Sequence, residues 1–377
     1  MDGTKSLYHD EYSDDFLEGG NSTDGSLPFE FSDYNQRVLV AVLYLIASVL
    51  GISGNSLVIM AVILSRKLRT TTNAFVVNLS VADLLTSVVI IWDAVELLGK
   101  DGQPISDWIC RVVSGTQTIT TGCSIYTLAL IGLQRLLLIT RPMTTYRAIY
   151  TPNFKIVLWL VAAWSVSLLV TVLPLLFGVG GVGYNPKYHH CGFMSSHPLS
   201  TYYNIIIAGA LYPIPLIIIV VCYVLIWLHL NRHAKRMVSP PDKSCDSIHM
   251  EPRSVTSTTR SLSELHRAAS QPRLDRRQNE ITKNMFYVVC AFILCLTPFA
   301  ICLFYEYSDP VLPYATVTLV FNGCVNPLIY ATKHRDFKTV FGCILRRRWN
   351  SIPEPSDFLK AMRRTNCCGD SDENSWV

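Results

Sequence analysis

The sequence predicts an all-α membrane protein: a bundle of seven transmembrane helices over residues 38–332, followed by a short amphipathic helix at the membrane surface. Only 16% of the 377 residues are charged, and the mean hydropathy is +0.30, whereas about 25% of residues are charged in soluble domains. Seven long apolar runs follow one another, and each is long enough to cross a hydrocarbon layer of about 30 Å as a helix. Their approximate bounds are 38–64, 73–98, 108–138, 153–177, 202–229, 283–305 and 311–332.

The distribution of basic residues orients this bundle. The segment Arg66-Lys67-Leu68-Arg69 directly follows the first apolar run. Because basic loops stay on the cytoplasmic side, we expect this loop inside and residues 1–37 outside. Residues 1–37 are rich in Asp and Glu and poor in apolar side chains, which predicts a disordered, acidic extracellular segment. Seven spans then place residues 349–377 in the cytoplasm as a tail.

The third apolar run is expected at the centre of the bundle. Residues 112–133 carry no charge but many hydroxyl and amide side chains. Such side chains form hydrogen bonds across a bundle, so this helix should have neighbouring helices on all sides. Arg135 lies at its inner end, and a charge within a membrane span is costly and usually functional.

Two further segments are expected on the cytoplasmic side. Residues 231–282 form a long third loop, and the stretch 239–275, which is rich in Ser, Thr, Pro and Arg, is expected to be flexible. Residues 333–348 place apolar side chains three to four residues apart among basic ones. This pattern predicts an amphipathic helix along the inner membrane surface. Cys343 on its edge is a candidate palmitoylation site.

Markers in every apolar run resemble those of the class A (rhodopsin-like) G-protein-coupled receptors. They occur in the family's order over about residues 38–348, and the full set is far more specific than any single marker. The markers are Gly54-Asn55-Ser56-Leu57-Val58, Leu79-Ser80-Val81-Ala82-Asp83-Leu84-Leu85, Cys110, Arg135, Trp164, Pro174, Pro215, Tyr223, Phe292, Cys295-Leu296-Thr297-Pro298 and Asn326-Pro327-Leu328-Ile329-Tyr330.

The resemblance implies a multi-pass plasma-membrane receptor that transduces an extracellular ligand, a peptide or a small molecule, to heterotrimeric G proteins. It also implies arrestin and kinases as partners of the cytoplasmic loop and tail, contact with membrane lipid, and no nucleic-acid partner. The chain contains no GxSxG, HExxH or P-loop motif, so no enzymatic activity is expected. Residues 137–142 are similar to the melatonin-like receptors and to the moody-like and trapped-in-endoderm-like orphan branch.

The resemblance also assigns a disulfide and an ion site. Cys110 and Cys191 would form a disulfide that tethers the second outer loop over the bundle. A mid-membrane carboxylate with hydroxyl and amide neighbours would hold one allosteric sodium ion, with a hydrogen-bonded polar cluster without an ion as the alternative. The candidate sodium ligands are Asp83, Ser124, Asn322 and Asn326. No other cofactor is expected.

A further set of residues would couple ligand binding to the cytoplasmic face. Its members are Asn55, Ile125, Gln134, Arg135, Pro215, Tyr223, Phe292, Pro298, Pro327 and Tyr330. Here the sequence departs from the family, because Gln134-Arg135-Leu136 replaces the usual acid-Arg-Tyr and Leu296 replaces a tryptophan. The amide of Gln134 cannot neutralise Arg135 as a carboxylate would, so we expect a weak resting lock and raised basal signalling.

Two residue types that are missing from the third and seventh apolar runs narrow the class of ligand. Residues 311–332 contain no lysine, which excludes a retinal Schiff base, and Gln117 stands where amine receptors have an aspartate, which argues against a biogenic amine. Asp93 and Glu96 lie three residues apart, on one helical face; they could accept a cationic ligand group, or they could face water near the headgroups. The candidate ligand-binding residues are Asp93, Glu96, Gln117, Thr121, Asn204, Phe299, Tyr305 and Tyr314.

The two ends of the chain carry short motifs. Asn21-Ser22-Thr23 is a glycosylation sequon. Tyr8 and Tyr12 lie among acidic residues, as in sulfated receptor tails, and such an anionic tail would steer a basic peptide ligand; a solvated tail is the alternative. The chain ends in Ser375-Trp376-Val377, a pattern that PDZ domains bind.

Two other functions remain open. The altered Gln134-Arg135-Leu136 triplet permits a receptor-like scaffold that does not signal. A seven-span transporter or channel would need charges along a continuous path, whereas the intramembrane charges here end at Asp83 and Arg135.

Overall fold

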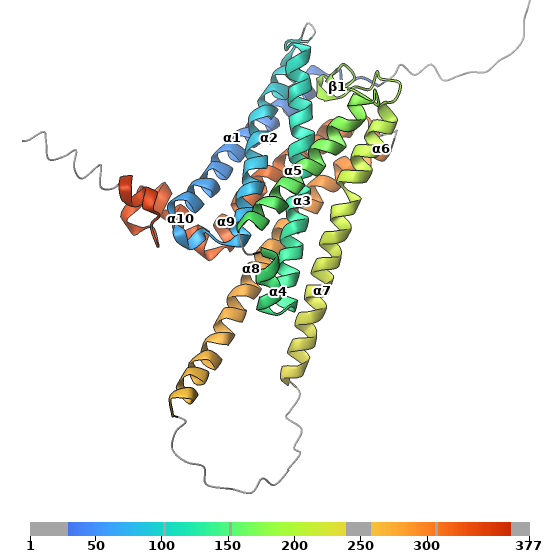
Figure 1. Cartoon of the computed structure of the whole chain (residues 1–377). Coiled ribbons are helices and arrows are strands. Elements are labelled where there is room, and N and C mark those ends of the chain that lie inside the picture. Colours follow the sequence, from blue (N-terminus) through green and yellow to red (C-terminus); the bar gives the residue numbers. More distant parts are fainter. Residues whose placement is uncertain (1–28, 101–102, 151–152, 239–257, 306–307, 363–377) are drawn as a thin grey trace, which may run out of the picture.

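The computed structural model describes residues 29–100, 103–150, 153–238, 258–305 and 308–362. Within these residues, seven helical segments are long and apolar enough to cross a membrane, which confirms the predicted seven-helix bundle. These spans are Tyr34–Leu64 (α1), Thr71–Leu98 (α2), Asp107–Thr140 (α3), Phe154–Leu176 within α5 (Asn153–Leu176), Ser200–Arg232 across α6 (Ser200–Leu211) and α7 (Pro213–Val238), Thr282–Phe304 within α8 (Thr258–Phe304), and Leu312–Lys333 (α9). Figure 1 shows them packed side by side.

The predicted central position of the third span is confirmed. In the most apolar part of α3, 61% of the residues are buried, against 22% in α5. Large apolar side chains such as Leu158, Ile217 and Leu294 are instead exposed on the outer helices, as expected where lipid covers them. The polar residues of α3 therefore face neighbouring helices rather than the hydrocarbon layer.

Several helix ends differ from the sequence-based bounds because of caps and prolines. Asp33 caps α1 by accepting a hydrogen bond from the Asn35 backbone N–H at 2.9 Å, so this helix starts at Tyr34. The fifth span is two helices rather than one, with a break at Tyr212. Pro213 begins α7, and a proline in this position cannot continue the backbone hydrogen bonding of α6.

The connection between the fifth and sixth spans is more helical than predicted. α7 continues to Val238 and α8 begins at Thr258, so the flexible stretch expected over 239–275 is wrong from residue 258 onward. The segment contains the strong helix formers Glu264, Leu265, Ala268 and Ala269, which favour a helix that extends beyond the apolar part of the sixth span. Figure 1 shows α7 and α8 extending beyond the other helices.

The connection between the third and fourth spans also contains a helix, α4 (Met143–Tyr150), which the sequence pattern does not predict. Tyr150 is 1% exposed and lies edge-on to Phe75 of α2, with ring centroids 6.3 Å apart. Tyr146 packs beside it at 5.2 Å. Two aromatic anchors thus hold this connection against the bundle.

The surface helix after the seventh span is α10 (Arg335–Leu345), within the predicted range 333–348. Its apolar residues Phe337, Val340, Phe341 and Ile344 are buried. They pack against protein rather than pointing into open space, since Phe337 stacks on Tyr330 of α9 at 5.5 Å. The amphipathic pattern therefore joins this helix to the bundle.

The tail after α10 folds back on the connection between the first and second spans. A short 3-10 helix, η3 (Trp349–Ser351), is followed by residues that meet the end of α1 and the 3-10 turn η1 (Arg66–Leu68). The Ser356 N–H donates to the Leu64 carbonyl at 2.9 Å, and the Arg66 N–H donates to the Glu354 carbonyl at 2.8 Å. Leu359 is 1% exposed. These contacts fix residues 352–362, which the sequence had suggested only as a tail.

Candidate functional site

A two-stranded hairpin covers the outer end of the bundle. β1 (Val182–Asn185) pairs antiparallel with β2 (His190–Phe193), with Tyr184 opposite Cys191. The expected disulfide between Cys110 and Cys191 is present, and both residues are buried. The disulfide joins the hairpin to the outer end of α3, so the hairpin is held over the mouth of the bundle.

A cavity of roughly 520 Å³ lies beneath this hairpin. Five of the predicted ligand-binding residues line it: Gln117, Thr121, Asn204, Phe299 and Tyr305. They come from α3, from α6, and from α8 with the residue that follows it, so three parts of the chain converge there. A volume of this size suits a compact small molecule.

The cavity wall combines apolar side chains with a few amides and hydroxyls. Ile125, Leu211 and Leu303 contribute apolar surface, as does Leu296, the residue that stands in place of the family's tryptophan. The buried Oδ1 of Asn204 has no hydrogen-bond partner in the described part of the chain. A ligand group with a hydrogen to donate would satisfy this oxygen.

The charged residues at the cavity rim neutralise each other. Lys187 Nζ lies 2.6 Å from Asp309 Oδ2, and the Tyr188 hydroxyl donates to Asp309 Oδ1 at 2.6 Å. Burial lowers the pKa of His190, another lining residue, to about 4, so its imidazole is neutral at physiological pH. Among the lining residues that the structure describes, no carboxylate is left to pair with a cationic ligand.

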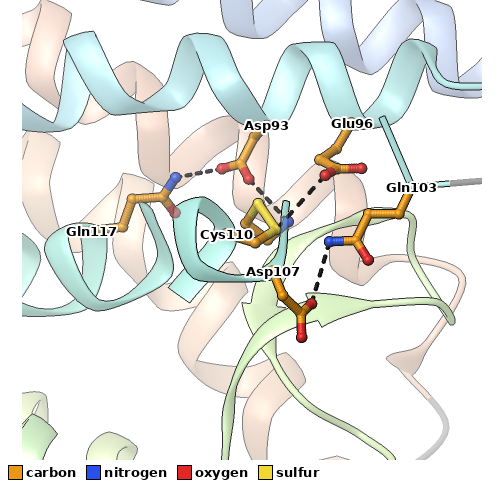
Figure 2. The surroundings of a disulfide bond; sticks show 7 residues. Asp93, Glu96, Gln103, Asp107, Cys110 and Gln117 are labelled. Carbon is orange, nitrogen blue, oxygen red and sulfur yellow. Dashed lines mark hydrogen bonds between the residues drawn. A yellow bond between two sulfur atoms is a disulfide. The ribbon is translucent and has the colours of Figure 1, made fainter. Parts of the chain in front are cut away.

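Asp93 and Glu96 do not line the cavity, and the expectation that they face water is wrong, since each is only 1% exposed. Figure 2 shows both carboxylates on α2 directed toward the disulfide. Asp93 Oδ1 accepts a hydrogen bond from the Cys191 backbone N–H at 3.0 Å, and Asp93 Oδ2 accepts one from Gln117 Nε2. The disulfide brings the hairpin backbone onto α2, and this contact buries the carboxylates.

Glu96 lies close to the disulfide sulfurs without forming a metal site. Its Oε1 is 3.9 Å from Cys110 Sγ, a packing contact, since a disulfide sulfur carries no hydrogen to donate. The carboxylate and the two sulfurs are close enough to suggest a metal triad, but oxidised sulfurs are not thiolate ligands. Nearby, Arg37 Nε donates to the Leu97 carbonyl at 3.0 Å, which ties α1 to the outer end of α2.

Three of the four predicted sodium ligands, Asp83, Ser124 and Asn326, meet in the middle of the bundle. Asp83 accepts hydrogen bonds from Ser124 Oγ at 3.2 Å and from Asn326 Nδ2 at 2.8 Å. The amide oxygens Oδ1 of Asn322 and Asn326 are buried and have no hydrogen-bond partner within the described ranges. A carboxylate, a hydroxyl and two unsatisfied amide oxygens are a donor set that a small hard cation prefers.

The first-span and seventh-span markers hold α1 and α9 in close contact. Asn55 Nδ2 donates to the Gly323 carbonyl at 2.9 Å. A Cβ atom on Gly54 would lie 2.9 Å from Cβ and Cγ of Pro327, so only glycine allows this approach.

Pro298 and Pro327 lie inside α8 and α9, while Pro215 is buried in α7. Ile125 and Phe292, the other members of the predicted packing trio, are both buried in the inner core.

At the end of α3 that lies away from the hairpin, Arg135 and Gln134 converge on one hydroxyl. Arg135 is 2% exposed, and its Nη2 donates to Thr72 Oγ1 at 2.8 Å. The side-chain amide of Gln134 also contacts Thr72, with Nε2 at 3.0 Å from Oγ1, and it donates to the Tyr146 hydroxyl at 2.9 Å. The hydroxyls of Tyr223 and Tyr330 are buried without hydrogen-bond partners in the described residues.

Sequence reasoning missed Thr72, Tyr146 and the Lys187–Asp309 pair. Thr72 is 62 residues from Gln134 and 63 from Arg135 in sequence, and no local pattern connects them.

The remaining predicted site residues lie outside the cavity and outside the buried clusters described above. The Tyr314 hydroxyl donates to Gln36 Oε1 at 3.0 Å, and the Cys343 thiol donates to the Ser351 carbonyl at 3.4 Å. Asn21, Tyr8, Tyr12, Ser375, Trp376 and Val377 lie outside the described residues.

A helical bundle with a capped outer cavity and a buried arginine at the inner end defines a seven-transmembrane receptor. The family model described as "7 transmembrane receptor (rhodopsin family)" matches residues 54–330, so the chain belongs to this family. It is therefore a multi-pass membrane receptor of the G-protein-coupled class, with G proteins as partners, and not an enzyme.

Known relatives differ in the ligands for which they are named. The chain is 27% identical to the octopamine receptor beta-2R of Chilo suppressalis, over 85% of this chain and 82% of the relative. It is 30% identical to the alpha-1D adrenergic receptor of Mus musculus (84% and 60%) and 25% identical to the melatonin receptor type 1B of Homo sapiens (81% and 78%). These similar identities do not confirm the expected orphan branch.

A solved structure supports the fold independently. The crystal structure of squid rhodopsin superposes with a TM-score of 0.69 at 19% sequence identity, covering 95% of this chain and 98% of that one. At this identity the comparison establishes the arrangement of helices alone.

Proposed function

We propose that this receptor binds a compact, uncharged ligand in the outer cavity and that the ligand shifts the bundle toward a state that exposes Arg135 to a G protein. The observation that carries this proposal is that one helix, α3, bears Gln117 in the cavity wall and Arg135 at the inner end. These residues are about five helical turns apart, roughly 27 Å at 1.5 Å per residue. A small displacement of α3 at the cavity is thereby carried to the cytoplasmic face.

The hydrogen bond between Gln117 and Asp93 supports an uncharged ligand with a group that donates hydrogen bonds. Because Gln117 Nε2 is committed to Asp93, its Oε1 remains to accept from a ligand. Asn204 Oδ1 offers a second acceptor on α6. Among the ligand types that the relatives' names suggest, an uncharged one such as melatonin fits this wall better than a cationic amine.

We also propose the following properties of this receptor, each of which is expected from the sequence. Residues 1–37 lie outside the cell and carry glycosylation at Asn21 and sulfation at Tyr8 and Tyr12. A sodium ion is held by Asp83, Ser124, Asn322 and Asn326, where it would supply a positive charge that opposes the Asp83 carboxylate. Arrestin and kinases bind the cytoplasmic side, Cys343 is palmitoylated, and a PDZ domain binds the end at Val377.

A ligand screen in cells tests the cavity. Wild type and Gln117→Ala receptors would be exposed to matched uncharged and cationic small molecules, with heterotrimer-dissociation sensors as the readout. The matched control is Gln103→Ala, because Gln103 is an exposed outer glutamine that contacts Asp107 at 3.3 Å. We expect uncharged hits whose potency falls at least tenfold in Gln117→Ala and is unchanged in Gln103→Ala. Hits confined to cationic compounds, or equally potent in all three proteins, would contradict the proposal.

A further inference from the structure

A second cavity, of about 300 Å³, lies between the cytoplasmic ends of α3 and α7. Four leucines, two from each helix, form its wall, and Arg141, His229 and Arg232 lie around it. It is separate from the outer cavity, with which it shares no lining residue. The proposed ligand binding in the outer cavity does not involve this second cavity.

The charge of this cavity is entirely basic. Its lining includes two guanidinium groups and an imidazole, and no acidic side chain. Within the described ranges, none of the observed ion pairs involves Arg141, His229 or Arg232. Arg141 directly follows α3 and Arg232 lies in α7. Two arginines that line one cavity suit a planar or tetrahedral anion that can accept several hydrogen bonds.

The cavity lies at the inner boundary of the membrane. Arg141 directly follows the last residue of α3, and Arg232 ends the apolar span that begins at Ser200. Leu225 of the cavity wall is 45% exposed, and its neighbours Val221 and Val224 are each 48% exposed. Apolar residues exposed on a membrane span face lipid. The basic groups are thus at headgroup depth, beside a leucine-lined surface at hydrocarbon depth.

We propose that this cavity binds an anionic phospholipid of the inner leaflet, with its phosphate between Arg141 and Arg232 and an acyl chain along the leucines. Basic pockets between spans on the cytoplasmic side suit such headgroups, and the leucines select a lipid over a free headgroup. The bound lipid bridges α3 and α7 close to Arg135, whose chain neighbour Leu136 lines the same cavity. It therefore holds these two helix ends together.

Native mass spectrometry of the purified full-length receptor tests this site, with phosphatidylserine as the probe and phosphatidylcholine as the neutral comparison. The test variant is Arg141→Gln/Arg232→Gln. The charge-matched control is Arg335→Gln/Lys338→Gln, two exposed residues of α10. We expect one tightly bound phosphatidylserine on the wild type, at least a tenfold loss of its affinity in the test variant, and less than a twofold change in the control.

A cavity-filling variant, Leu228→Trp, removes the space without removing charge. We expect it to weaken phosphatidylserine binding at least fivefold, and this variant keeps the test informative if the double variant fails to fold. Equal losses in the two double variants would show unspecific surface attraction and overturn the proposal. Unchanged binding by Leu228→Trp, or displacement of the lipid by equimolar glycerophosphoserine, would do the same. A variant that loses G-protein coupling but retains lipid affinity would assign the surface to a protein partner instead.

Discussion

Gln134 donates a hydrogen bond from its side-chain amide to the hydroxyl of Tyr146, 2.9 Å away. This bond joins the inner end of α3 to α4, the helix that connects the third and fourth spans. Thr72 of α2 completes the cluster, because it contacts the amide of Gln134 and accepts from Arg135 at 2.8 Å. The hydroxyl of Thr72 and the side-chain amide of Gln134 thus lie beside the inner end of α3, where the family usually has a carboxylate next to the arginine.

Replacing Tyr146 by Phe should raise basal G-protein signalling. The change removes one neutral hydrogen bond from the resting cluster, worth about 1 kcal/mol, which corresponds to roughly a fivefold shift in the resting equilibrium. Gln134→Asp should act in the opposite direction, because a carboxylate beside Arg135 makes a stronger, charge-assisted bond. The measurement is basal heterotrimer dissociation at matched surface expression. Wild-type basal activity no higher than that of Gln134→Asp would contradict the weak-lock account.

Asp93→Ala should destabilise the receptor more than Asp93→Asn. Alanine leaves the buried Cys191 N–H without its acceptor, a loss of roughly 1–3 kcal/mol, whereas asparagine retains one oxygen for that bond. Thermal unfolding of the purified protein, together with hydrogen exchange at the Cys191 amide, measures the difference. Asp107→Ala is the matched control, because Asp107 is exposed and its ion pair with Arg111 is 3.6 Å long. Equal effects of Asp93→Ala and Asp93→Asn would show that Asp93 does not hold the hairpin.

Acidification should loosen the hairpin through His190. Burial lowers the pKa of His190 to about 4, from an ordinary value of 6.5. Between these two values the unfolded state binds more protons than the folded state, so stability is full above pH 6.5 and falls as the pH drops toward 4. Because His190 is only partly buried in the cavity wall, we expect a loss of about 1–2 kcal/mol at pH 4.5.

Melting temperatures from pH 7.5 to pH 4.5 provide the measurement. The His190→Gln variant should lose this part of the pH dependence, while His197→Gln, a variant of another histidine in the same outer loop, should retain it. A pH profile of His190→Gln that superposes on the wild-type profile would rule out this role of His190.

Sodium should stabilise the receptor through Asp83. At a sodium concentration tenfold above its Kd, the gain is about 1.4 kcal/mol. The thermal shift between sodium chloride and N-methylglucamine chloride should disappear in Asp83→Asn and shrink in Asn322→Ala, which removes an unsatisfied buried oxygen. Potassium chloride is the ionic-strength control. An undiminished sodium shift in Asp83→Asn would exclude this site and favour the hydrogen-bonded cluster without an ion.

The sequence predicted the features that depend on composition and local pattern. The seven spans follow from apolar runs of sufficient length, and the central position of α3 follows from its many hydroxyl groups. The disulfide was expected through family resemblance, and Gln117 and Asn204 were expected at the cavity. The spans are predictable because a segment that crosses lipid must satisfy its backbone hydrogen bonds internally, which a helix does.

The sequence did not predict contacts between segments that are far apart in the chain. Asp93 was expected to face ligand or water, but the Cys191 backbone lies on it, and only the folded hairpin brings the two together. The same holds for Thr72 with Arg135 and for Ser356 with Leu64. The helical extension of α8 was missed for another reason: its polar composition was read as flexibility, although its residues include strong helix formers.

The most direct test of the central claim, that this receptor couples to a G protein through Arg135, is basal heterotrimer dissociation in cells that express wild type or Arg135→Ala. A panel of G-protein sensors and equal surface expression are required. We predict a basal signal for the wild type with at least one G-protein family and its loss in Arg135→Ala. An unchanged signal in Arg135→Ala, at equal surface expression, would contradict the account.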